Sequence, residues 1–151
     1  MRLLSGRSPA HGFCDDEQTR RLLRSRPPRQ ALAWAAARLG GQVVSARALR
    51  GGMSSAVHLI TVQRPGGRHD QAVLRRYVRP DPDEPDPAGR EARALRLAEA
   101  ADVPTPALLA VDPDGTGAGV PALLMTPASS TTCVTTGARS GSWWRTCSPV
   151  P

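Results

Sequence analysis

The chain has 151 residues and a formal net charge of +7, and all 20 of its basic residues are Arg. The absence of Lys and Asn is typical of a GC-rich genome, which makes the basic charge weak evidence for a nucleic-acid partner. No apolar run approaches the ~20 residues that span a bilayer, and three widely spaced Cys residues fit neither a disulfide framework nor a metal-binding pair. We expect a cytoplasmic protein with reduced thiols and no membrane partner.

Two helices are predicted before any strand. Residues 1–28 have the composition of a loosely ordered basic lead-in, and within it residues 19–26 predict one short helix that two Pro residues end. Residues 29–39 predict a second helix, because Leu and Ala recur along one stripe of it. Gly40 offers the left-handed conformation that ends this helix.

Strands and one further helix follow. A helix is predicted over residues 87–101, with Asp86 as its N-cap and Pro87 at its first position. Turn sequences rich in Gly, Pro and Asp separate five segments that predict strands, namely residues 42–49, 55–63, 71–78, 107–111 and 120–125. This order of elements predicts an α+β fold, an antiparallel sheet of about five strands plus a helix.

The composition changes abruptly after Thr126. Residues 127–151 contain no acid, no Leu and no Ile, and ten of them are Ser or Thr. No helical or strand periodicity persists in this segment. We interpret residues 29–126 as one folded domain and residues 127–151 as a disordered or frameshifted tail.

Three features that suit phosphate binding follow one another along the predicted domain. A glycine-containing turn, residues 51–55, joins two strands, and its small residues let backbone N–H groups approach phosphate oxygens. Arg75 lies within the next strand, and Glu91 lies one turn into the following helix. A strand cation can hold phosphates while a helix carboxylate pairs with it and fixes its direction. Strand alternation places Arg75 and Tyr77 on one face and Arg76 on the other.

This arrangement resembles the start of the aminoglycoside phosphotransferase-like family, an offshoot of the protein-kinase fold that phosphorylates small hydroxylated molecules. The resemblance covers about residues 30–126. Five motifs carry it in the family's order: residues 49–57, 72–77, 89–95, 103–106 and 121–125. It implies a protein-kinase-like small lobe whose cofactor is ATP, with Mg²⁺ in the intact enzyme. The nucleotide-binding residues that it implies are Gly51, Gly52, Met53, Ser54, Ser55, Arg75, Glu91 and Met125.

The sequence departs from the family at several positions. Ser55 stands where the family often has Asn, and Arg75 replaces the Lys of kinases with a bulkier group that can grip a phosphate with two N–H groups. Family enzymes carry an H-x-D loop, an Asn and a metal-binding Asp in a second, helical lobe. This chain has no H-x-D sequence and no Asn. We therefore expect that the C-terminal helical lobe is missing, that no catalytic or metal-binding residue is present, and that the chain is a truncated phosphotransferase, inactive alone.

A non-catalytic, basic accessory or nucleic-acid-binding protein is the alternative. Residues 1–50 hold ten Arg and three acids, whereas residues 51–126 hold eight Arg and ten acids. The predicted domain therefore carries little of the positive charge, and it has no aromatic-rich strand of the kind that stacks RNA bases. We expect a nucleotide and a small hydroxylated acceptor as partners, and no nucleic acid.

The remaining polar residues are predicted to be structural. The Asp pairs at positions 81/83 and 112/114 lie in Pro-bounded turns, where carboxylates commonly bind the local backbone. His58 is expected on the surface of its strand, and His69 is expected in a turn.

Overall fold

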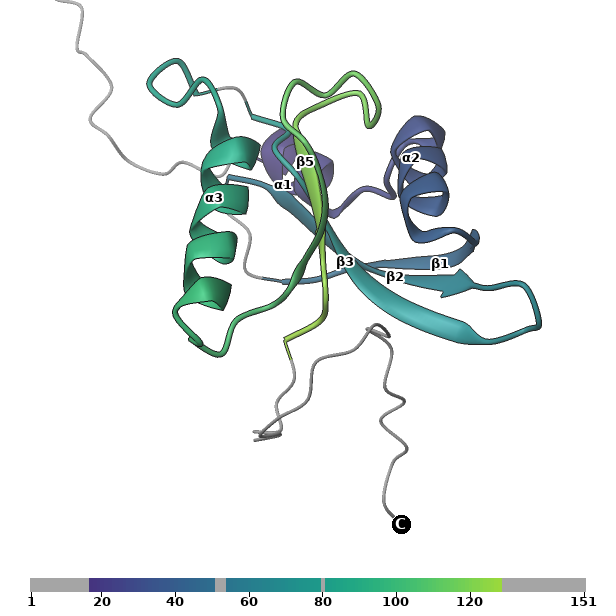
Figure 1. The fold of residues 1–151 in the computed structure, drawn as a ribbon. Coiled ribbons are helices and arrows are strands. Elements are labelled where there is room, and N and C mark those ends of the chain that lie inside the picture. Colours follow the sequence, from purple (N-terminus) through teal and green to yellow (C-terminus); the bar gives the residue numbers. More distant parts are fainter. Residues whose placement is uncertain (1–16, 51–53, 80, 129–151) are drawn as a thin grey trace, which may run out of the picture.

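A computed structural model describes residues 17–50, 54–79 and 81–128 of the chain. These residues form one five-stranded antiparallel sheet in the order β1-β2-β3-β5-β4, with α2 and α3 on either side of it (Figure 1). The elements are α1 (Glu17–Arg24), α2 (Arg29–Leu39), β1 (Gln42–Ala48), β2 (Ala56–Gln63), β3 (His69–Arg76), α3 (Pro87–Ala100), β4 (Leu108–Asp112) and β5 (Ala122–Met125). The predicted α+β fold, a kinase-like small lobe with a sheet of about five strands, is confirmed.

The hairpin of β2 and β3 sets the register of the sheet. Gln63 pairs with His69, and Arg64 N–H donates to the carbonyl of Arg68 at 2.7 Å across the turn. Gly66 and Gly67 have φ of 89° and 84°, which residues with a side chain rarely adopt. Because this turn is tight, β3 begins before the predicted start at residue 71 and takes in His69, which was expected in a turn.

Two glycines, Gly40 and Gly41, connect α2 to β1. Gly40 ends α2 in the left-handed conformation, with φ of 64° and ψ of 44°, as its position predicted. The next residue, Gly41, lies against β2, where an added Cβ would come within 2.6 Å of the backbone oxygen of Gln63. A side chain at position 41 would therefore push β1 away from β2.

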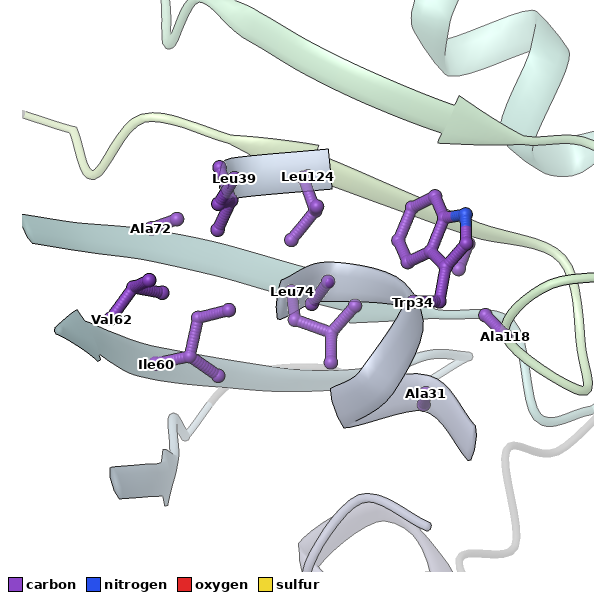
Figure 2. Packing of buried hydrophobic residues seen from close by; sticks show 11 residues of the cluster. Ala31, Trp34, Leu39, Ile60, Val62, Ala72, Leu74, Ala118 and Leu124 are labelled. Carbon is purple, nitrogen blue, oxygen red and sulfur yellow. The ribbon is translucent and has the colours of Figure 1, made fainter. Parts of the chain in front are cut away.

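The main apolar cluster lies between α2 and the sheet. Trp34 is its largest member and is 8% exposed, while Ile60 and Leu74 are fully buried beneath the helix. Figure 2 shows side chains of this cluster converging from α2 and from the strands, among them Ile60 of β2, Leu74 of β3 and Leu124 of β5. The cluster contains Ala31, Trp34, Ala35, Leu39, Ile60, Val62, Ala72, Leu74, Ala118, Ala122 and Leu124.

A second, smaller cluster lies on the other face, beneath α3. The helix contributes only Ala88 and Ala92, which are 0% and 1% exposed, and these pack with the strand residues Val73, Leu123 and Met125. The small Ala side chains let the axis of α3 come close to the sheet. Polar residues of α3 are thereby brought near β3.

The described part of the lead-in is folded against the sheet. Helix α1 packs on β2, Leu23 is buried, and the His58 ring nitrogen Nε2 lies 2.9 Å from the carbonyl oxygen of Ser25. The expectation that His58 lies on a strand surface is wrong, because α1 and the segment after it cover that strand. Within residues 17–50, 54–79 and 81–128, no helix combines the length and the apolarity that a membrane span requires.

Candidate functional site

The strand register places the two neighbouring arginines on opposite faces of the sheet. Arg75 pairs with Val57 on β2 and with Leu123 on β5, in the interior of the sheet. Leu74 belongs to the cluster beneath α2, so the alternation of side chains directs Arg75 toward the α3 face and Arg76 toward the α2 face. Arg76 is 3% exposed, and its Nε has no hydrogen-bond partner among the residues that the structure describes.

Arg75 binds both residues that the sequence placed beside it. Its Nη1 donates to Glu91 Oε1 at 2.7 Å, and its Nε donates to Ser55 Oγ at 2.9 Å. The Arg75 and Glu91 side chains are 32% and 25% exposed, so the pair lies at an opening rather than in the core. Ser55 is buried, so its hydroxyl is held in the position where it accepts the hydrogen bond from Arg75.

The pairing leaves part of the Arg75 guanidinium open. Among the described residues, Nη2 has no hydrogen-bond partner, because the contacts to Ser55 and Glu91 use Nε and Nη1. A guanidinium presents its N–H groups in a rigid planar fork that matches phosphate oxygens. The open edge can therefore receive an anionic ligand while the other edge is held in place.

Tyr77 completes this group, and its role was not predicted. Its hydroxyl donates a hydrogen bond to Glu91 Oε2, and its ring centroid lies 5.7 Å from Cζ of Arg75. Burial, together with the hydrogen bond to Glu91, raises the pKa of the Tyr77 phenol well above its usual range, so the phenol stays protonated at neutral pH. The signal available in the sequence was the alternation that places Tyr77 and Arg75 on one strand face.

The N-terminus of α3 positions Glu91. Asp86 caps the helix by accepting a hydrogen bond from Gly89 N–H at 2.8 Å, and Pro87 occupies the first turn, as predicted. Arg93 forms an ion pair with Asp86 at 3.1 Å. The cap fixes the start of the helix, and with it the direction in which Glu91 leaves the helix toward β3.

The remaining predicted nucleotide-binding residues are distributed along the same face or lie outside the described residues. Ser54 is exposed in the turn that precedes Ser55, whereas Gly51, Gly52 and Met53 lie outside the described residues. Met125 pairs with Val73 and Leu108 and is 7% exposed, in the cluster on the Arg75 face of the sheet.

The carboxylate pairs have structural roles. Asp112 accepts hydrogen bonds from Gly117 N–H and Ala118 N–H at 3.0 and 2.7 Å, and so closes the loop between β4 and β5. Asp81 accepts from Asp83 N–H at 3.0 Å. No group of three or more His, Cys, Asp or Glu side chains that could hold a metal ion occurs in the described part of the chain. Both Asp pairs act as turn residues, as predicted.

A separate hollow lies away from Arg75. It has a volume of about 390 Å³ and is bordered by Arg24, Arg26, His58 and residues of β1. None of the residues that bind Arg75 borders it. The hollow is therefore not part of the Arg75 site.

Comparison with known protein families gives a match to a family of phosphotransferases. Residues 45–146, more than half of the chain, match the model of the phosphotransferase enzyme family. The match includes Ser55, Arg75 and Glu91. It also extends beyond Thr126, the residue at which the resemblance described above ends. No curated protein and no solved structure matches the chain.

Proposed function

The chain belongs to the phosphotransferase enzyme family, and we propose that residues 29–126 are the ATP-binding small lobe of a small-molecule O-phosphotransferase. The observation that carries the proposal is the contact of Arg75 with Glu91 at 2.7 Å and with Ser55 at 2.9 Å. It joins the strand cation, the helix carboxylate and the end of the glycine-containing turn at one opening of the sheet.

In this proposal the phosphates of ATP bind the open edge of the Arg75 guanidinium. Glu91 balances part of the charge of Arg75 and holds its direction, so little side-chain entropy is lost when the nucleotide binds. Ser54 and Ser55 lie beside the phosphates and Met125 borders the adenine, while the contacts expected of Gly51, Gly52 and Met53 lie outside the described residues. These assignments use one face of the sheet throughout.

Phosphoryl transfer needs groups that this chain lacks. In the family Mg²⁺ bridges the phosphate oxygens and offsets their charge, and an H-x-D loop and an Asn supply the base and a metal ligand. The sequence has neither an H-x-D motif nor any Asn. We therefore propose that this chain binds ATP weakly and does not transfer phosphate to a small hydroxylated acceptor on its own.

The binding proposal is tested by titrating the chain with Mg-ATP and following its backbone amide signals by NMR. Loss of a charge-assisted contact to phosphate removes about 1.5–3 kcal/mol, so Arg75→Ala should weaken the affinity at least ~10-fold. Arg96→Ala is the matched control, because Arg96 is exposed on α3 away from the opening. Unchanged affinity in a folded Arg75→Ala protein would overturn the proposal.

The inactivity of the chain is tested separately with radiolabelled ATP and a panel of small hydroxylated acceptors. We expect no labelled phosphoester with the purified chain, since the sequence has no H-x-D motif of the kind that supplies the catalytic base in the family. Phosphotransferase activity that co-purifies with the protein would show that this part of the proposal is wrong.

A further inference from the structure

Tyr77 contacts both members of the ion pair. Its hydroxyl donates to Glu91 Oε2, while Arg75 donates to the other oxygen, Oε1. We infer that Tyr77 is a positioning residue that occupies one oxygen of Glu91 and thereby keeps the outer edge of the Arg75 guanidinium open for phosphate. The inference rests on the function proposed above, and it adds a residue that the family resemblance did not supply.

The reason lies in the usual geometry of arginine and carboxylate. The two groups commonly form a bidentate pair in which two N–H groups meet both carboxylate oxygens. Here the pair has a single hydrogen bond between Nη1 and Oε1, because the Tyr77 hydroxyl already binds Oε2. Without that hydroxyl, Oε2 becomes available to a second N–H group of Arg75. The guanidinium can then turn toward Glu91 and away from the opening.

The phenol is well placed to act as a fixed donor. The backbone N–H of Tyr77 donates to the carbonyl of Pro121 at 2.8 Å, which ties the residue to the chain just before β5. Its ring lies 5.7 Å from Arg75 Cζ, within the range of a cation–π contact. The phenol stays protonated at neutral pH, so its hydroxyl has a proton to donate to the carboxylate. The ring of Tyr77 thus contacts Arg75, while its hydroxyl binds Glu91.

The role of the hydroxyl can be separated from that of the ring. Tyr77→Phe keeps the ring and its packing, whereas Tyr77→Leu removes the ring as well. We expect Tyr77→Phe to unfold at nearly the wild-type urea concentration and to bind Mg-ATP about 3- to 10-fold more weakly, within the range of one hydrogen bond. Ser25→Ala, which removes an exposed hydroxyl in the segment after α1, away from Arg75, is the control for loss of an OH group.

A second measurement reports the guanidinium directly. The side-chain Nε and Nη signals of Arg75, assigned by comparison with Arg75→Lys, should shift in Tyr77→Phe, and rotation of the guanidinium should slow because a bidentate pair restrains it. This measurement needs no nucleotide. Arg75 signals that remain as in wild type, or a Tyr77→Phe protein that binds Mg-ATP as tightly as wild type, would overturn the inference.

The two measurements distinguish failure of the inference from failure of the proposed function. If wild-type protein and all variants fail to bind Mg-ATP, the proposed function is wrong, and the inference falls with it even where the Arg75 signals shift. If wild type binds and Arg75→Ala does not, but Tyr77→Phe binds like wild type, only the role of Tyr77 is overturned. If Tyr77→Phe binds Mg-ATP more weakly than wild type and rotation of the Arg75 guanidinium slows, the inference is supported.

Discussion

The two faces of the sheet are built from different kinds of residue. Beneath α2 the apolar cluster includes large side chains, with Trp34, Ile60 and Leu74 filling the space between helix and strands. Beneath α3 the helix contributes only Ala88 and Ala92, and beside this thin apolar layer lies the polar group around Arg75. The first face supplies most of the apolar burial, and the second holds ionisable side chains at an opening.

The difference shows how one small sheet can be stable and still present charge. A partly exposed ion pair contributes little to stability, because solvent screens it and two long side chains must be ordered. The α3 face can therefore keep Arg75 and Glu91 only if burial elsewhere offsets the cost. Substitutions on the two faces should accordingly have different consequences, and the following predictions test that division.

The largest effect is expected from Trp34→Ala on the α2 face. Removing a buried Trp from a packed cluster costs about 3–5 kcal/mol of unfolding free energy, a large part of the stability of a small domain. Urea unfolding followed by circular dichroism measures it. Leu97→Ala is the control, because Leu97 is 71% exposed on α3 and should change the midpoint little. Comparable losses in both variants would contradict the division between the faces.

The next effect concerns the buried His58 beneath α1. Burial lowers the pKa of His58, and Arg76 acts in the same direction, against the hydrogen bond to Ser25. Since the folded pKa lies below the unfolded value of about 6.5, the unfolded chain binds more protons as the pH falls below that value. The stability should therefore be full at pH 7.5 and fall toward pH 5.5, by at most ~1.4 kcal/mol per pH unit for this group.

His58→Gln tests that assignment. The Gln amide can still donate to the carbonyl of Ser25 but does not titrate. Urea midpoints measured between pH 5.5 and 7.5 should show a flatter dependence in this variant than in wild type. An equal slope in the two proteins would show that His58 is not the group responsible.

A smaller effect is expected from Asp86→Ala on the α3 face. The substitution removes the cap of Gly89 N–H and the ion pair with Arg93, and loss of such a cap costs about 1 kcal/mol. Thermal unfolding should register the loss, and Asp86→Ser, which keeps a capping oxygen, should restore most of it. Because Glu91 lies near this end of α3, Mg-ATP affinity should fall in parallel. A stability loss without any change in affinity would separate the cap from the site.

Much of the fold could be predicted from the sequence because its signals are local. Gly40 ended a helix, Asp86 and Pro87 began one, and the five strand segments were found with small errors at their ends. The start of β3 was misplaced, since the pairing across the turn, and not the composition of the strand, brings His69 into the sheet. The burial of His58 could not be predicted, because it depends on where α1 packs.

The site was predictable only in part. The order of Arg75 and Glu91 along the chain, together with the family resemblance, brought these two residues together, and the structure places them 2.7 Å apart. Tyr77 was placed on the correct face, but its hydrogen bond to Glu91 requires the distance between α3 and β3, which no local pattern specifies. Gly51, Gly52 and Met53 stay predictions, because they lie outside the described residues.

The register of β2 and β3 has a consequence for variation in length. Ala56 faces Arg76 and Val57 faces Arg75, so losing a single residue of β3 between the turn and Arg75 would bring Arg76 to the opening in place of Arg75. The arginine doublet would preserve the charge at the opening after such a change. Tyr77, however, would turn to the opposite face and lose Glu91. Natural insertions and deletions should therefore gather in the turn at residues 64–68 and be absent from the strand that carries the doublet.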